Sequence, residues 1–186
     1  MTTLRIMAVA IALGVVAIPA TAQVQVVIDA TDRGWYTALG NHQPDNTNYV
    51  AGHASIHTFR NWFVFDLSTI DVEIVALQLR AWNPPNGFIG DATETYVNYD
   101  VTTDLTDLVN DLGGLAAYDD LGSGTVYASY EASLADNETF VVIDLNAAAV
   151  ADANGAAGGL WGIGGAITTL AGDGDQVLFG HGRQSR

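Results

Sequence analysis

The sequence contains no cysteine and no lysine, and both absences narrow what the protein can be. Without cysteine there is no disulfide framework, so the stability of the fold must come from a packed core, with or without bound metal ions. The six basic residues are all arginine and stand against 21 acidic residues, which gives a formal net charge of −15. Such a surface repels phosphate backbones and anionic lipids, so we expect no nucleic-acid partner.

The common catalytic signatures are also missing. The sequence has no G-x-S-x-G elbow, no H-E-x-x-H motif, no Walker loop and no cysteine nucleophile. Carboxylates are abundant, so residue types alone leave a glycosidase pair open, but no two carboxylates stand out by their setting. We therefore predict a protein that is not an enzyme, and the alternative is a polysaccharide-active enzyme with an unrecognised site.

The first 22 residues have the pattern of a signal peptide. Arg5 precedes an apolar run over 6–18, and the segment closes on the small residues of 20–22. The run is short for a membrane span, although an uncleaved anchor helix is the alternative. Cleavage before Gln23 leaves five basic and 21 acidic residues, a net charge of −16, and no membrane span. We expect a secreted protein, extracellular or at the cell surface of a Gram-negative-type bacterium.

Short alternating segments between turns rich in Gly, Asn and Pro predict an all-β fold. The strands are expected over 24–30, 59–67, 72–82, 93–102, 124–134, 139–145, 159–170 and 175–182. Helical spacing predicts a helix from 104 that ends at Gly113-Gly114, and a second one after Asn146 as N-cap. Residues 23–186 are thus predicted to form one antiparallel, jelly-roll-like β-sandwich with one or two short helices. The polar region 31–58 is expected to be a loop with short strands.

Five stretches carry a resemblance to a known group of proteins. They are RNWFVFDLS (60–68), ALQLRAWNP (76–84), TETYVNYDVTT (93–103), DLGSGTVYASY (120–130) and LNAAAVAD (145–152). In this order they resemble small secreted bacterial proteins of the PEP-CTERM-associated type, and more loosely DNRLRE-type, carbohydrate-binding-module-like domains. The resemblance implies export and a β-sandwich. The sorting motif of that group is not present in this sequence, so the resemblance does not imply an anchor.

Aromatic residues beside turns are the candidates for ligand binding. Trp35 and Tyr36 lie in the polar region 31–58, and Trp82 precedes a Pro-Pro turn and shares a strand face with Arg80. Exposed rings stack on the C–H faces of sugars, while arginine donates to hydroxyl groups. We predict a ligand-binding role for these four residues, with a neutral glycan or the extracellular matrix as partner. A self-associating structural surface protein is a further alternative, and the oligomeric state is left open.

The stretch FRNWFVFDL (59–67) has apolar residues on both faces. Trp62 and Arg60 lie opposite the face of Phe63 and form either a ligand platform or a second buried face. We predict the second, with Trp62 covered by a loop or helix and Arg60 held by a carboxylate. The residues expected to be nearly inaccessible are Phe63, Phe65, Leu77, Leu79, Val141 and Ile143.

Two groups of residues have the composition of metal ligands. Asp173 and Asp175 flank Gly174 and predict a calcium site, to which Asp29 and Asp32 are possible contributors; the alternative is a plain hairpin turn. His53 and His57 are expected to share one strand face, which permits a zinc site, but without a third ligand we favour ordinary loop histidines.

Overall fold

The structure is a computed structural model that describes residues 24–172 and 174–180. The predicted signal peptide and Asp173 lie outside the described residues. The strands are β1 (Ala30–Thr37), β2 (Ala51–Ala54), β3 (His57–Asp66), β4 (Leu77–Asn83), β5 (Thr93–Asp100), β6 (Val126–Ser133), β7 (Thr139–Leu145), β8 (Leu160–Ile167) and β9 (Gln176–Leu178). The helices are α1 (Leu105–Val109), α2 (Gly114–Asp120), the 3-10 helix η1 (Leu134–Asp136) and α3 (Ala147–Gly155).

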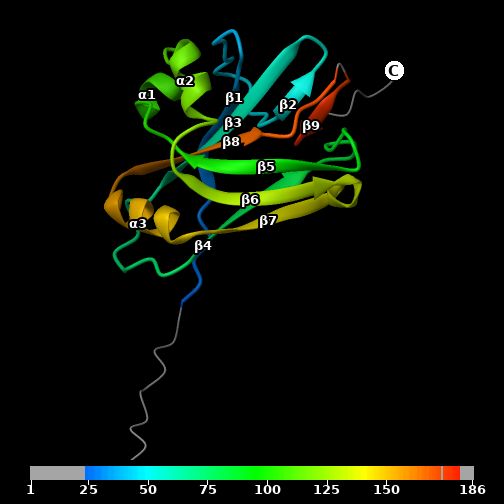
Figure 1. Cartoon of the computed structure of the whole chain (residues 1–186). Helices are drawn as coiled ribbons and strands as arrows, with labels where there is room; N and C mark the ends of the chain where they lie inside the picture. Colours follow the sequence, from blue (N-terminus) through cyan, green and yellow to red (C-terminus); the bar gives the residue numbers. More distant parts are fainter. Residues whose placement is uncertain (1–23, 173, 181–186) are drawn as a thin grey trace, which may run out of the picture.

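All strand pairs are antiparallel, and the predicted all-β, sandwich-like class is confirmed (Figure 1). The larger sheet has the order β6-β5-β8-β3-β2-β9, with β1 on the other edge of β3, and β4 and β7 form a second sheet. The described residues contain three α-helices where one or two were expected. None of the helices in the described ranges is long and apolar enough to cross a membrane.

The main core fills the space between the two sheets. Alternation along β4 and β7 points Leu79, Ala81, Val141 and Ile143 inward, and each is at most 5% exposed. Phe63 of β3 meets them from the larger sheet. Four of the six predicted core residues are therefore confirmed as buried. Phe65 and Leu77 are only half-buried, so the prediction that they are inaccessible is wrong.

A second, smaller core lies on the opposite face of the larger sheet, under α1 and α2. Its buried residues are Tyr36, Trp62, Val64, Leu108, Ala117 and Leu121. Trp62 is fully buried there, as predicted, because the two helices cover this face of β3 (Figure 1). The sequence predicted a single helix ending at Gly113-Gly114, which is wrong, because the chain turns at Asp111 and Gly114 with φ of 58° at both and continues as α2.

The first strand is displaced from its predicted position. Residues 24–29 are not in a strand, and β1 begins at Ala30, the last residue of the predicted strand, and continues over 31–37 of the region expected to be a loop. β1 pairs with β3 so that Gly34 lies opposite Trp62. A Cβ on Gly34 would come within 2.7 Å of both His42 and Trp62, so the glycine makes room for the second core. Tertiary packing therefore selects this register over the higher β-propensity of 24–29.

His42 is a buried titratable residue of the second core. It is 5% exposed, its Nδ1–H donates to the carbonyl of Trp35 (2.9 Å), and its ring lies against Tyr36 and Trp62. Burial lowers the pKa of His42 below its ordinary value of 6.5, against the opposing effects of the Trp35 bond and of the charge of Asp111. Because the unfolded chain binds the proton more tightly, stability is fully present above pH 6.5 and falls as the pH drops below it.

We therefore expect the free energy of unfolding to decrease as the pH falls below about 6.5, with His42 as one cause. The His42→Phe variant keeps an aromatic ring but cannot titrate, so its stability is expected to change less over this range, even if it is lower at every pH. Urea unfolding at several pH values measures both slopes. Identical slopes in the two proteins would show that His42 does not carry this dependence.

Candidate functional site

The outer face of the β4–β7 sheet has the largest exposed aromatic side chains that lie side by side. Trp82 is 41% exposed and lies opposite Phe140, which is 48% exposed. Along the same face, Arg80 lies opposite Val142, and Gln78 opposite Asp144. We call these six residues the Trp82 face. The alternation that buries Leu79 and Val141 is what turns them toward solvent.

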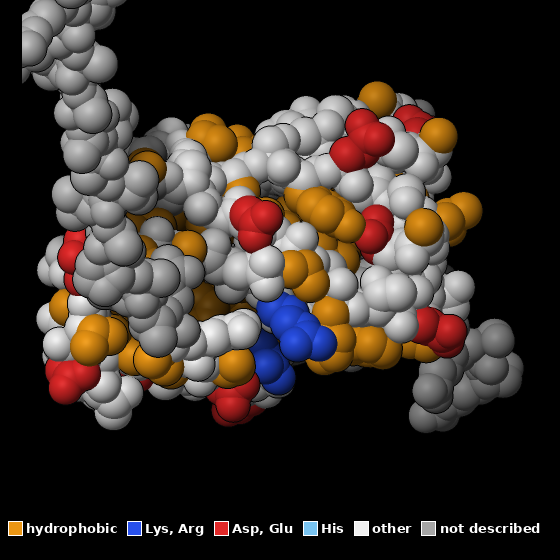
Figure 2. Space-filling model, turned by 90° about the horizontal axis from the view of Figure 1, so that it is seen from below, with side chains coloured by type: hydrophobic (Ala, Val, Ile, Leu, Met, Phe, Trp, Pro, Cys, Tyr) orange, Lys and Arg blue, Asp and Glu red, His pale blue; other side chains and the backbone are white. Residues whose placement is uncertain are grey.

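The side chains of the Trp82 face contact one another in cross-strand pairs. The Trp82 and Phe140 rings meet edge to face with centroids 5.1 Å apart, and the Arg80 guanidinium lies 4.1 Å from the centre of the Phe140 ring. Gln78 Nε2 donates to Asp144 Oδ1 (2.8 Å). The underside view in Figure 2 shows basic atoms bordered by hydrophobic side chains, with carboxylates around them.

Arg80 is free to contact a ligand. It is exposed, and the only ion pair in the described part of the chain joins Arg60 and Asp119. Stacking on Phe140 holds the guanidinium in place. The face thus combines two ring surfaces, a fixed hydrogen-bond donor and an amide–carboxylate pair, which together suit a ligand with both C–H faces and hydroxyl groups.

The structure separates the four predicted ligand residues. Arg80 and Trp82 lie together on the Trp82 face. Tyr36 is fully buried and its hydroxyl donates to the carbonyl of Leu108 (2.9 Å), so the expectation that Tyr36 is exposed is wrong. Trp35 is half-buried and packs edge to face on Phe59. Both belong to β1 rather than to a loop, and strand packing occupies their rings.

Trp62 and Trp82 do not share a surface. Trp62 belongs to the larger sheet and Trp82 to the β4–β7 sheet, so no joint platform exists. Arg60 lies 3.9 Å from an Asp119 carboxylate oxygen, as predicted, but its shorter contacts are to the carbonyls of Tyr118 (2.8 Å) and Asp119 (3.1 Å). It also stacks on the Tyr118 ring at 4.2 Å. The arginine therefore fastens α2 to β3.

Gln78 of β4 and Phe140, Val142 and Asp144 of β7 complete the face but were not among the four predicted ligand residues; the three β7 residues follow from the phase of their strand. Their signal was present in the sequence, because inward Val141 and Ile143 imply outward neighbours in the same strand. The missing information was the partner of that strand. Only the pairing of β4 with β7 shows that Phe140 lies opposite Trp82.

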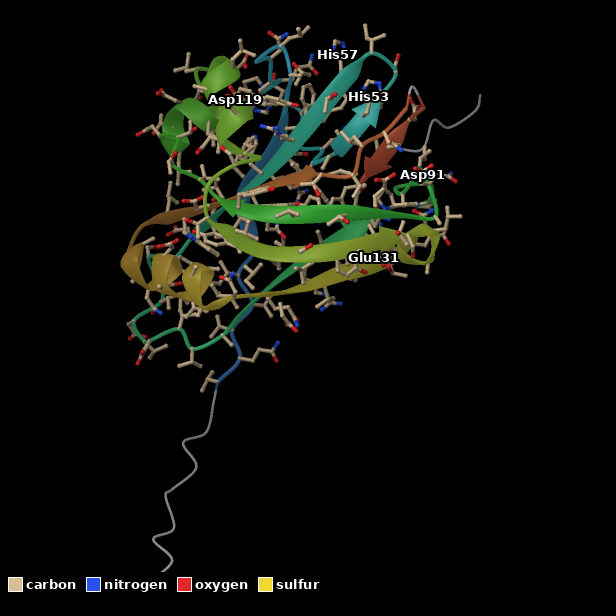
Figure 3. All side chains as sticks on the ribbon, in the orientation of Figure 1. His53, His57, Asp91, Asp119 and Glu131 are labelled. Carbon is tan, nitrogen blue, oxygen red and sulfur yellow. The ribbon has the colours of Figure 1, made fainter. Side chains whose placement is uncertain are left out.

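The structure describes some of the predicted metal ligands but not Asp173. Asp175 Oδ1 accepts a hydrogen bond from the backbone N–H of Ser55 (2.7 Å) in the β2–β3 turn, and Asp173 lies outside the described residues. Within the described ranges, no three acidic or histidine side chains are grouped as a metal site. His53 lies opposite Thr58 and His57 opposite Ala54, so the two histidines point to opposite faces, and the prediction of a shared face is wrong (Figure 3).

The calcium site at Asp175 stays a prediction with a direct test. If calcium binds there, millimolar calcium raises the melting temperature by mass action. In Asp175→Asn the amide oxygen can still accept from Ser55, so we expect the calcium-dependent rise to disappear while the melting temperature in chelator stays unchanged. Equal melting curves of the original protein in calcium and in chelator would contradict the site.

A cavity of about 380 Å³ lies beside α3. Its lining includes Asp100, Asp152, Tyr127 and Trp161. Tyr127 donates to Asp152 Oδ2 (2.7 Å), and Asp100 Oδ1 accepts from the backbone of Thr125 (2.6 Å). Burial, followed by the bond to Asp152, raises the pKa of Tyr127. Both carboxylates thus already have structural partners.

In comparisons with known proteins, the chain matches no protein-family model and no curated protein. The class that the fold defines is an antiparallel β-sandwich-like domain with short helices. The resemblance to secreted proteins of the PEP-CTERM-associated type and to carbohydrate-binding modules remains a prediction.

Proposed function

We propose that the protein is a secreted, non-enzymatic module of the bacterial cell surface or extracellular matrix that binds neutral glycans through the Trp82 face. The observation that carries the proposal is the exposed Trp82–Phe140 ring pair with Arg80 stacked on it. An indole and a phenyl ring left nearly half exposed give the fold less stabilisation than buried rings would. Binding a ligand would recover that contribution.

The chemistry of the face fits a saccharide better than other ligand classes. A sugar ring places its apolar C–H face on Trp82 or Phe140, and its hydroxyl groups can accept from Arg80 and donate to Asp144. The net charge of −16 expected after signal removal disfavours highly anionic chains, unless cations bridge them. A neutral glycan that lies along β4 and β7 therefore matches both the shape and the charge.

We expect the mature protein to bind one or more neutral glycans on an array, with arms in calcium and in chelator. Trp82→Ala and Phe140→Ala should each weaken the binding of such a glycan by about 2- to 12-fold, because each removes one aromatic contact worth roughly 0.5–1.5 kcal/mol. The matched control is Leu112→Ala, which removes an exposed apolar side chain in the turn between α1 and α2. Calorimetric titration gives the three affinities.

Binding that is equally strong in Trp82→Ala, Phe140→Ala and Leu112→Ala would remove the Trp82 face as the site. A protein that binds no glycan in either arm would overturn the proposed ligand class. In that case Trp82 and Phe140 remain available to a protein partner, which the alternative of a structural surface protein requires.

The cavity beside α3 favours the second candidate, a polysaccharide-active enzyme. It brings Asp100 and Asp152 to one concave surface, and two carboxylates are the usual machinery of glycoside hydrolysis. Release of reducing ends from a polysaccharide, lost in both Asp100→Asn and Asp152→Asn, would support this candidate over the binding module.

A further inference from the structure

We infer that copies of this protein associate head to tail, with residues 24–28 of one copy added as a strand to the open edge of β4 in the next. Residues 24–28 read Val-Gln-Val-Val-Ile, a composition typical of strands. In a single copy they lie in no strand and make no hydrogen bond with the described residues. Val24, Val26 and Val27 are 83%, 57% and 82% exposed. Ile28 is half-buried and packs against the main core of its own copy, so the part of this strand-like segment that lacks a partner is 24–27.

The matching acceptor is the edge of β4 that faces away from β7. The Trp82 carbonyl accepts from the Tyr49 hydroxyl (2.8 Å) and so points to this open side. In an antiparallel strand, alternate residues point both their N–H and C=O groups to the same side, so those of Arg80 and Gln78 are open too. Neither residue's backbone groups have a hydrogen-bond partner outside the β4–β7 ladder among the described residues.

Donor and acceptor agree in length and in apolar surface. The edge from Gln78 to Trp82 spans five residues, as does the segment 24–28, and at the Trp82 end its carbonyl is already occupied by the Tyr49 hydroxyl. On the inner face of β4, Leu77 is only half-buried while Leu79 and Ala81 are buried. A strand added beside β4 would cover Leu77 with alternate side chains of the donor. The remaining side chains of the added strand would point to the outer face of the sheet and extend the Trp82 face.

Charge favours the segment 24–28, rather than the β4 edge of a second copy, as the strand that pairs with β4. Pairing two β4 edges antiparallel about their centre would place Arg80 opposite Arg80, which is destabilising. The segment 24–28 carries no charge. In Figure 1 the start of the described chain leaves the body of the domain below β4, so a donated segment need not press two acidic surfaces together. Since donor and acceptor are different surfaces, the contact is heterologous and builds rings or open chains rather than closed dimers.

Sedimentation velocity over a range of protein concentrations tests the association, on protein whose start at Gln23 has been checked by mass spectrometry. We expect oligomers that grow with concentration and also with salt, because salt screens the repulsion between acidic copies. Consecutive residues point their N–H groups to opposite sides, so the double variant Val26→Pro with Val27→Pro removes a ladder donor in either register. It should sediment as a monomer with an unchanged melting temperature, because both residues are exposed and outside the strands.

Cross-linking tests the geometry, helped by the absence of native cysteine. Val26 is the centre of the donor and Arg80 the centre of the acceptor, so they meet whether the added strand is parallel or antiparallel. A mixture of Val26→Cys protein and Arg80→Cys protein should form a mixed disulfide under mild oxidation. The control replaces the Arg80→Cys protein by Glu131→Cys, whose exposed site lies on β6 (Figure 3).

A mixed disulfide at Arg80→Cys well above the Glu131→Cys level, together with loss of oligomers in the double proline variant, supports strand addition. A wild-type protein that stays monomeric at every concentration and salt level overturns it. Equal yields of mixed disulfide with the Arg80→Cys and Glu131→Cys proteins also overturn it. Oligomers that persist in the double proline variant do the same. If two copies of the Arg80→Cys protein cross-link with each other in preference to the mixed disulfide, strand addition is wrong and the β4 edges of two copies pair symmetrically.

Discussion

Replacing Trp62 by alanine is expected to lower the free energy of unfolding by about 3–5 kcal/mol, because the change leaves a cavity where a fully buried indole packed. Trp62 joins β3 to the helices of the second core, so its loss loosens α1 and α2 as well. Urea unfolding followed by circular dichroism measures the effect. The indole Nε1–H has no acceptor among the described residues, so Trp62→Phe should cost much less than alanine.

The effect of Trp62→Ala on stability is to be compared with that of Trp82→Ala. Trp82 is 41% exposed on the outer face of β4, so its removal should change stability by less than about 1 kcal/mol while it weakens glycan binding. If instead Trp62→Ala left stability intact and abolished binding, the face under α1 and α2 would be the ligand platform. Such a result would contradict the covered position of Trp62.

Replacing Gly165 by alanine is the second change with a large expected effect. The glycine lies on β8 between Asn61 of β3 and Asn98 of β5, and the Tyr96 hydroxyl occupies the space where a Cβ would be. That hydroxyl donates to Asn61 Oδ1 (2.8 Å) and accepts from Asn98 Nδ2 (3.2 Å). A methyl group at Gly165 would overlap Tyr96 and Asn61 and break this buried network.

We expect Gly165→Ala to destabilise the fold by about 2–5 kcal/mol, the sum of overpacking and of polar groups left unpaired. Adding Tyr96→Phe removes the overlapping hydroxyl, so the double variant should be more stable than Gly165→Ala alone. The control is Gly155→Ala at the end of α3, where a Cβ meets no atom within 4 Å. This change should be neutral or stabilising by up to about 1 kcal/mol. Similar losses in both glycine variants would contradict the packing argument.

Most of the strands could be read from the sequence because alternation reports which residues face a core. The segment 139–145 was predicted with the bounds of β7, and Asn146 caps α3 by accepting from the N–H groups of Ala148 and Ala149. These are local signals, since the information lies in adjacent side chains and backbone groups. Helix α2 was missed because Gly113-Gly114 resembles the end of a helix, whereas in the structure Gly113 is the N-cap of a new one.

The sequence predicted residues of β4 as part of the candidate site but none of β7. Arg80 and Trp82 were identified because their outward phase follows from inward Leu79 and Ala81. Phe140 has the same kind of signal, but the sequence does not say that its strand is the neighbour of β4. Tyr36 was misassigned because the polar residues around it resemble a loop, whereas β3 provides the partner that makes 30–37 a strand.

By itself the sequence determined the acidic, cysteine-free character of the chain, its all-β class and the inner and outer phase of most strands. These properties depend on composition and on a period of two, which local reading detects. The tertiary structure alone decided which strands are neighbours: β1 beside β3, which buries Tyr36, and β4 beside β7, which brings Phe140 to Trp82. Strand pairing joins residues far apart in the chain, and it is set by the packing of the whole core rather than by the propensity of any one segment.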